Sequence, residues 1–292
     1  MKRVFLTGST GFVGKNLITN FDSKYDISKY TKNSPISINH DIVIHLAGKA
    51  HDLKKVANVG EYYKVNTELT KEVFDSFLSS NASIFIALSS VKAVADEVKG
   101  VLTEQANPNP QTHYGRSKLL AEQYIFSQAI PEGKRVYVLR PCMIHGPGNK
   151  GNLNLLFKVV SKIKIWPLGA FENRRSYCGV NNLLFVINEL IDNNTVSSGI
   201  YNVSDNNPLS SNQIINLISS LEKKRILILH IPRKIIYFLS WMGTLCNLSF
   251  NKRSLAKVTC NYIVSNEKLK KALKKELPFD AIDNMTNTLK SF

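Results

Sequence analysis

Three polar side chains in the middle of the chain have the types and spacing needed to exchange a proton with a ketone or an alcohol. Tyr114 and Lys118 lie four residues apart in HYGRSKLLAEQ, so they share one face of a helix. An ammonium beside a phenol favours the phenolate, and we expect Lys118 to lower the pKa of Tyr114 from about 10 toward neutrality. Such a Tyr can act as a general acid or base. Ser90 ends the apolar run SIFIALSS and could hydrogen-bond the same substrate oxygen.

A glycine-rich turn near the start of the chain has the context of a phosphate-binding loop. The segment TGSTGFVG follows an apolar run and opens a helix-like one. Gly8 would allow the tight turn, Gly11 would let the backbone approach a pyrophosphate, and Gly14 would let helix and strand pack closely. The helix N-terminus would face the phosphate charge. The spacing is GxxGxxG, which differs from the GxGxxG of most dehydrogenases.

The elements that must position these residues alternate between strand and helix over the first 140 residues. Apolar runs predict strands, and apolar residues at helical spacing predict helices. In chain order the expected elements are 4–8, 12–21, 25–32, 41–48, 61–80, 83–90, 113–129 and 135–141, beginning with a strand. This alternation predicts an α/β fold with a Rossmann-type, doubly wound parallel sheet. The stretch from Thr31 to His40 is too short for a further strand and crossover, so we expect a truncated element there.

The pattern loosens after Gly146, where loops rich in Asn, Gly and Ser separate short helices. We expect a dinucleotide-binding Rossmann domain over residues 1–150. Residues 151–292 would form mainly a smaller substrate-binding lobe, with a segment near 175–203 returning to the sheet. Residues 231–250, IPRKIIYFLSWMGTLCNLSF, are strongly apolar. We interpret them as a buried helix of the smaller lobe; the alternative is a helix in a bilayer interface.

Composition limits the classes of partner. The chain has 292 residues and a formal net charge of +16, spread along its length, which favours a compositional bias over an anionic partner. No basic run is interleaved with aromatics as in single-strand binders, so we expect no nucleic acid. We expect no integral membrane segment. Four cysteines without a CxxC pair fit a reducing compartment and predict a cytoplasmic protein.

The combination of motifs resembles the extended short-chain dehydrogenase/reductase family, of the NAD-dependent epimerase/dehydratase type. The glycine loop, a Ser at a strand end and YxxxK about 24 residues later all fit it. HLAGKAH, VNTELT with Asn66, and LRPCMIHGPG, with His145 replacing the usual Tyr, resemble further family segments. The resemblance implies that Ser90, Tyr114 and Lys118 are catalytic. It implies cofactor contacts for Gly8, Thr10, Gly11, Phe12, Val13, Gly14, Lys32, Leu46, Ala47, Gly48, Tyr114 and Lys118.

The nicotinamide cofactor follows from the end of the second strand, where family members that select NAD usually carry an acidic residue. Here the segment is YTKN, and Lys32 would suit a 2′-phosphate. We therefore expect NADP, with NAD as the alternative.

The substrate follows from the second half of the chain. NRRSYCGVNNL resembles a segment of nucleotide-sugar epimerases and dehydratases in which an Arg grips the diphosphate, here Arg175 beside Arg174. The stretch from Gly151 to Tyr177 most resembles bacterial UDP-4-keto-6-deoxy-N-acetylhexosamine 4-reductases of polysaccharide biosynthesis. This resemblance implies that the substrate contacts Ser90, Asn152 and Arg175. Dehydratases carry an Asp-Glu pair where this chain has Val91 and Lys92, so we reject that reaction.

We therefore predict NAD(P)H-dependent reduction of the 4-keto group of a UDP-linked 6-deoxy-hexosamine. The alternative is a 4-epimerase of a UDP-hexose or UDP-N-acetylhexosamine, which uses the same residues. A second alternative is a non-catalytic nucleotide-sensing protein on the same fold, although such relatives usually lose the Tyr or Lys. A homodimer is possible. His45 and His51 lack metal-ligand spacing, so we expect no metal; His45 would be a core residue, His51 would line the cofactor or be solvated, and His113 would be incidental.

Overall fold

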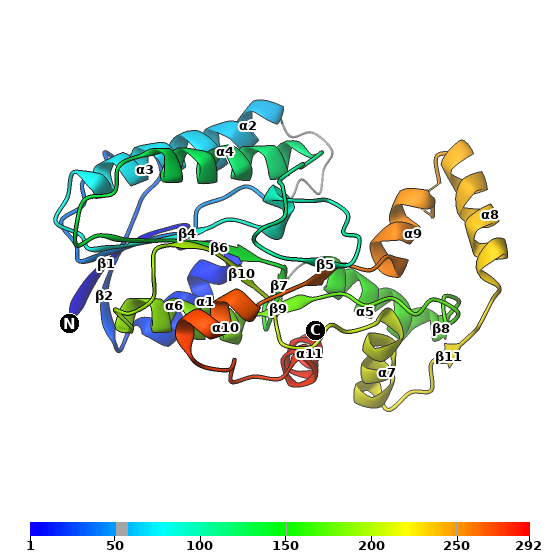
Figure 1. Ribbon diagram of the computed structural model, residues 1–292. Coiled ribbons are helices and arrows are strands. Elements are labelled where there is room, and N and C mark those ends of the chain that lie inside the picture. The colour runs from blue at the N-terminus through cyan, green and yellow to red at the C-terminus, as the bar shows by residue number, and fades with distance from the viewer. Residues whose placement is uncertain (51–57, 150, 249) are drawn as a thin grey trace.

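A six-stranded parallel sheet forms the centre of the molecule (Figure 1). The computed structural model describes residues 1–50, 58–149, 151–248 and 250–292. The strand order is β10-β6-β4-β3-β1-β2. The bounds are β1 Lys2–Thr7, β2 Tyr25–Lys29, β3 Ile42–His45, β4 Ile84–Leu88, β6 Arg135–Pro141 and β10 Gly199–Val203. The predicted α/β class and doubly wound parallel sheet are confirmed.

The strands are buried on both faces because their side chains alternate between two hydrophobic cores. Val4 and Leu6 of β1 join one core, and Phe5 between them joins the other. Helices α1 (Phe12–Phe21) and α6 (Val180–Asp192) cover the first face, and α3 (Leu69–Leu78) and α4 (His113–Ser127) cover the second (Figure 1). A sheet covered by helices on both sides can carry ligands only at its strand ends.

The truncated element expected between Thr31 and His40 is present as predicted. Residues 30–41 form neither helix nor strand, and β2 is left as the edge of the sheet. β1 pairs with β2 on one side and with β3 on the other. The strand order therefore reverses between β1 and β3. In open α/β sheets ligands bind outside the carboxyl ends of the strands at such a point.

The long helix expected over residues 61–80 is interrupted. It consists of α2 (Val59–Tyr63), a π-helical turn (Lys64–Glu68) and α3, and the turn contains the buried Asn66. The extra residue in a π-turn changes the direction of the side chains that follow it, and such turns are frequent at functional sites.

The second half of the chain builds a separate hydrophobic core. Within this half β8 pairs with β11, and two further short parallel pairs, β7–β9 and β12–β5, join it to the first half of the chain. The remaining elements of the chain are β5 Val101–Leu102, β7 Met143–His145, α5 Asn152–Ile163, β8 Ile165–Trp166, β9 Tyr177–Gly179, α7 Ser211–Glu222, β11 Leu227–Ile228, α8 Arg233–Leu245, α9 Lys252–Thr259, β12 Ile263–Val264, α10 Glu267–Leu273 and α11 Ala281–Leu289. The division of the chain at residue 150 stays a prediction.

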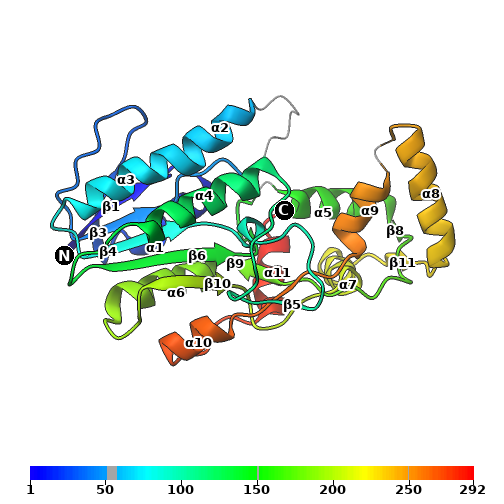
Figure 2. The same cartoon turned by 45° about the horizontal axis from the view of Figure 1, so that its top comes forward.

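The expectation of a buried helix at residues 231–250 is wrong. Helix α8 buries only Ile236, Ser240 and Gly243. Both views place it at the end of the molecule farthest from β1 and β2, where one side packs on α9 and the rest faces outward (Figures 1 and 2). Among the described residues, no helix is long and apolar enough to cross a membrane.

Candidate active site

Ser90 and Tyr114 come together because helix α4 packs tightly against the chain that leaves β4. Ser90 caps the 3₁₀ turn Val91–Ala93, and its Oγ accepts a hydrogen bond from Lys92 N at 3.2 Å. Gly115 makes the packing possible, since a Cβ there would lie 2.3 Å from the Lys92 carbonyl oxygen. The residue after Tyr114 thus brings the first turn of α4 against the turn that Ser90 begins.

The pKa of Tyr114 moves in the direction opposite to our expectation. Burial raises it, the Ser90 side chain acts in the other direction by hydrogen bonding, and Glu122 and Tyr62 raise it further. The phenol is therefore in its protonated form near neutral pH. The expected lowering by Lys118 is not found, because burial is the largest influence on this pKa and only the hydrogen bond with Ser90 favours the phenolate.

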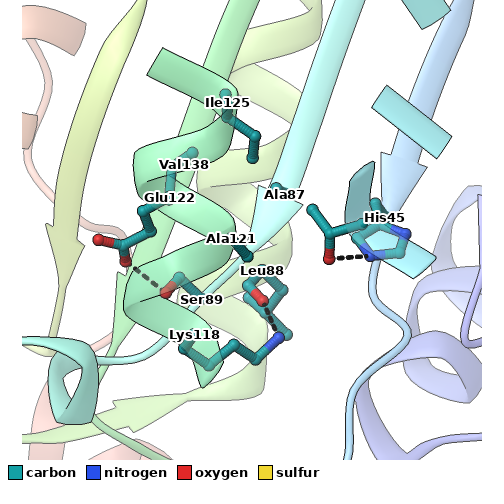
Figure 3. Close-up of a pocket in the computed structure, with 10 residues that line it drawn as sticks. His45, Ala87, Leu88, Ser89, Lys118, Ala121, Glu122, Ile125 and Val138 are labelled. Carbon is teal, nitrogen blue, oxygen red and sulfur yellow. Dashed lines mark hydrogen bonds between the residues drawn. The ribbon is translucent and has the colours of Figure 1, made fainter. Parts of the chain in front are cut away.

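Lys118 is buried beneath the site and points toward the end of β4 (Figure 3). Its Nζ donates to the Leu88 carbonyl oxygen at 2.7 Å. Burial lowers its pKa from 10.5 to about 8, although Glu122 raises it. A group with this pKa is mostly charged at pH 7, so Lys118 places an ammonium beneath the candidate site.

A buried ion pair anchors the middle of α4, one turn beyond Lys118. Arg140 of β6 donates from Nη2 to Glu122 Oε2 at 2.5 Å and from Nε to Oε1 at 3.0 Å. Ser89 also donates to the Glu122 carboxylate, so the residue before Ser90 is tied to the same helix (Figure 3). This network fixes the distance between the strand end and the helix that carries Tyr114 and Lys118.

Asn66 in the π-helical turn holds the segment after β3 against α4. Its Oδ1 accepts from Lys49 N at 2.8 Å, and its Nδ2 donates to Lys49 O at 3.0 Å and to Ser117 Oγ at 2.9 Å. The same segment contains Gly48, where a Cβ would lie 3.0 Å from Lys118 Nζ. Asn66 therefore positions the backbone that faces Lys118. In the sequence only the family resemblance points to Asn66, and it is not among the predicted site residues.

The glycine loop has the geometry expected of a phosphate cradle. Gly8 has a φ of +73°, which favours glycine, and its carbonyl accepts from Gly11 N at 3.0 Å. A Cβ on Gly14 would lie 2.2 Å from Gly8 O, so α1 packs directly on the loop. Gly11 precedes α1 and offers no side-chain cap, which leaves the first N–H groups of the helix for a ligand.

These contacts fit a dinucleotide bound at the carboxyl ends of β1 and β3, where the strand order reverses. The exposed Gly11 and Gly48 border it from the two strand ends, and Lys118 lies next to Gly48. Of the remaining predicted cofactor residues, Thr10 and Lys32 are exposed, Phe12, Leu46 and Ala47 are half-buried, and Val13 is buried. Lys32 follows β2 by three residues, at the same edge of the sheet as the glycine loop.

The histidines of the sequence have different surroundings. His45 is a core residue as expected: its ring bonds Thr7 Oγ1 and Thr70 Oγ1, and burial lowers its pKa to about 3. His113 is exposed and pairs with the Tyr63 hydroxyl. His51 lies outside the described residues.

Arg175 lies in a cationic cluster that the sequence did not indicate. Its Nη1 donates to Cys260 O at 3.1 Å, and its guanidinium lies 5.8 Å from the centre of the Tyr262 ring. Lys92 Nζ lies 4.2 Å from the centre of the same ring. Burial lowers the Lys92 pKa, Asp96 opposes this, and Arg175 adds to the lowering. The Tyr262 ring thus lies near two cations, and one of them, Lys92, follows Ser90 by two residues. In the sequence, Lys92 is notable only because it stands where dehydratases carry an acidic residue.

Two further residues of the predicted substrate site are not brought into this cluster. Arg174 is exposed, and its backbone pairs with Asn261 and Tyr262. Asn152 begins α5, and its side chain lies outside the described part of the structure.

Known proteins share both the sequence and the fold of this chain. A family model described as the NAD dependent epimerase/dehydratase family matches residues 4–204. A UDP-glucose 4-epimerase of Vibrio cholerae is 30% identical over 76% of this chain and 76% of its own length. A GDP-6-deoxy-D-mannose reductase of Pseudomonas aeruginosa is 24% identical over 80% of this chain and 84% of its own length. The solved structure of RMD from Pseudomonas aeruginosa complexed with NADPH superposes on this chain with a TM-score of 0.74 and 20% identity. The match covers 100% of this chain and 98% of that one.

Proposed function

We propose, from the premise that the chain belongs to the NAD dependent epimerase/dehydratase family, that it reduces the 4-keto group of a UDP-linked 6-deoxy-hexosamine with NADPH or NADH. The observation that carries this proposal is the placement of Ser90, Tyr114 and Lys118 at the end of β4, beside the carboxyl ends of β1 and β3 that the glycine loop borders. The positive charge at the β2 end, with Lys32 in place of an acidic residue, supports NADPH.

The proton chemistry follows from the protonation states in the site. When bound, the nicotinamide supplies the hydride to carbon 4. Tyr114, whose pKa burial raises, donates its phenolic proton to the ketone oxygen, which becomes the product alcohol. Ser90 orients that oxygen by hydrogen bonding. The Lys118 ammonium stabilises the phenolate left on Tyr114 until solvent returns the proton.

The cluster around Tyr262 would hold the diphosphate of the substrate. Arg175 can form a bidentate contact with a phosphate, and Lys92 adds a second positive charge from the loop after Ser90. Because Lys92 follows Ser90 by only two residues, a diphosphate held there would keep the attached sugar close to the candidate catalytic residues. The residues after Ser90 also support the rejection of a dehydratase, since Val91 and Lys92 stand where dehydratases carry two carboxylates.

The second candidate is a 4-epimerase. It is favoured by the relative at 30% identity, and 4-epimerase is the more frequent activity in the names of similar proteins. An epimerase would use Tyr114 in both directions, first taking a proton from the substrate hydroxyl and then returning it. The residues described here serve either reaction, and the difference is whether reduced cofactor is consumed.

Absorbance at 340 nm separates the two candidates. The purified chain is mixed with NADPH or NADH and a UDP-4-keto-6-deoxy-N-acetylhexosamine. Stoichiometric loss of reduced cofactor is the result expected for the reductase. Interconversion of UDP-sugars at carbon 4 without net loss would overturn it in favour of the epimerase.

The variant Tyr114→Phe tests the role of the phenol in either reaction. We expect turnover to fall by about 10²-fold or more, the usual contribution of a positioned general acid, while cofactor affinity is kept. Tyr124→Phe is the matched control, since Tyr124 lies on the same helix and its hydroxyl donates to Asp75 Oδ1. Unchanged turnover in Tyr114→Phe would refute the mechanism.

A further inference from the structure

An apolar stripe runs along the outward side of helix α8. Ile235, Phe238, Leu239, Met242 and Leu245 follow one another at i, i+3, i+4, i+7 and i+10, so they share one face. Their exposed fractions are 49%, 56%, 46%, 44% and 66%. Apolar side chains grouped in this way on a surface mark an interaction site, whereas scattered ones do not.

The opposite side of α8 is fixed to the protein, so the stripe cannot turn inward. Ile236, Ser240 and Gly243 are buried there. A Cβ on Gly243 would lie 1.8 Å from Phe250 O, so the chain after the helix passes directly against it. The Lys252 N–H donates to Thr244 Oγ1 and ties α9 to the last turn of α8. The stripe is therefore the outer surface of a packed helical pair.

Aromatic side chains extend the exposed surface around α8. Tyr237 is 53% exposed and packs edge-on against Phe171, and Trp241 is 44% exposed with its ring 5.9 Å from that of Phe238. Tyr and Trp are the residues preferred at the boundary between lipid and water, because their rings are apolar with one polar group.

The charge around this helix is concentrated and of one sign. Residues 223–266 contain eight Lys or Arg and no Asp or Glu, so they carry half of the net charge of +16. Our interpretation of an evenly spread charge is therefore wrong for this segment. Lys234 in the first turn of α8, and Lys252 and Arg253 at the start of α9, are exposed. Basic residues beside an exposed apolar helix face are complementary to an anionic lipid surface.

We propose that α8 is a docking surface for an anionic lipid bilayer, with the helix lying in the plane of the interface and its apolar stripe among the headgroups. With 13 residues, α8 is about 20 Å long, too short to cross a hydrocarbon core of about 30 Å. A second copy of the chain is a poorer partner, because a two-fold contact would bring two segments with eight positive charges each together. The proposal does not depend on the reaction proposed above.

Vesicle flotation tests the docking surface on the full chain. One set of vesicles contains phosphatidylcholine alone, and the other contains equal parts of phosphatidylcholine and phosphatidylglycerol. We expect binding to the mixed vesicles and little to the neutral ones. Replacing both Lys252→Ser and Arg253→Ser should lower the partition coefficient about 30-fold, from roughly 1 kcal/mol per basic residue at an anionic surface. Replacing both Phe238→Ser and Leu239→Ser should lower it about tenfold through lost apolar burial.

Matched controls come from exposed residues elsewhere in the fold. The exposed fraction of Ile282 is 45%, similar to that of Leu239. Lys99 and Lys290 are also exposed. Ile282→Ser alone, and Lys99→Ser with Lys290→Ser, should leave binding unchanged. Thermal unfolding of each variant checks that the fold is kept.

Three results would overturn the proposal. The first is an absence of binding to the mixed vesicles, and the second is equal binding by the folded α8 or α9 variants and the wild type. The third is that the wild type is a dimer, and that the double variant Phe238→Ser and Leu239→Ser is a monomer with unchanged vesicle binding. A second copy of the chain would then cover the stripe.

Discussion

The ion pair between Glu122 and Arg140 allows a test of how the fold supports the candidate site. Both residues are 3% exposed. The guanidinium makes three hydrogen bonds to the carboxylate, and Ser89 makes a fourth. The variant Glu122→Gln keeps the shape of the side chain and one acceptor oxygen but removes its charge. Arg140 is then a buried cation without a counter-charge.

The cost follows from this burial. Removing one partner of a buried ion pair lowers the free energy of unfolding by about 3–5 kcal/mol. Because the amide oxygen of Gln can still accept a hydrogen bond, we expect a loss near the lower end, about 3 kcal/mol. In thermal unfolding this corresponds to a decrease of about 10 °C in the melting temperature. The double variant with Glu122→Gln and Arg140→Met removes both charges, and we expect it to regain most of the loss, because neutral replacement of a whole buried pair is often tolerated.

Urea denaturation of the wild type and the two variants measures these differences. A loss below about 1 kcal/mol for Glu122→Gln, or a double variant less stable than the single one, would refute the reasoning. A second measurement separates a structural role from an electrostatic one. The Glu122 carboxylate raises the Lys118 pKa against burial. In Glu122→Gln the Lys118 pKa should therefore fall below about 8, and the alkaline limb of kcat/KM should move to lower pH. An unmoved limb would mean that Glu122 only supports the fold.

Four further outcomes are expected. The wild-type kcat/KM should fall as the pH rises through about 8, where Lys118 loses its proton while Tyr114 keeps its own; a pH profile without this limb would contradict the role of Lys118. Because the native Lys118 pKa lies below its unfolded value of 10.5, the unfolded chain binds more protons between these pH values, and this group should make the free energy of unfolding rise with pH there. Gly14→Ala should cost about 1–3 kcal/mol and weaken cofactor binding in a fluorescence titration, since its Cβ would meet Gly8 O at 2.2 Å. Asn66→Ala removes the three hydrogen bonds of a buried side chain and should cost about 3 kcal/mol in urea denaturation, with a loss of cofactor affinity that a distant variant of equal stability does not show.

The sheet and the candidate catalytic residues could be predicted because their signals are local. Each central strand is a short apolar run bounded by Gly, Ser or Pro, and SIFIALSS and RVYVLRP coincide with β4 and β6 to within two residues at either end. Tyr114 and Lys118 needed only the i, i+4 spacing of a helix to be placed together. The π-turn at Asn66 has no such signal. Its hydrogen bonds reach Lys49 and Ser117, which are 17 and 51 residues away, so only the folded chain can favour it.

The direction of the Tyr114 pKa shows the limit of spacing as an argument. Sequence spacing brings an ammonium and a phenol to one helix face, which predicts that the phenolate is favoured. In the fold the Leu88 carbonyl accepts a hydrogen bond from Lys118 Nζ, and burial raises the pKa of the half-buried Tyr114. Burial depends on elements from several parts of the chain, and no local pattern encodes it.

Helix α8 departs from its sequence-based expectation for a related reason. Apolar residues on every side of a helix usually mean that it is buried on every side. The fold gives α8 neighbours on one side only, because it extends from the end of the second core. The sequence nevertheless contains a signal against burial, in the 44 residues from Lys223 to Asn266 that include no acidic residue. A charge averaged over the whole chain conceals such a segment. Charge counted separately around each apolar stretch favours the interfacial alternative for α8 from the amino-acid sequence alone.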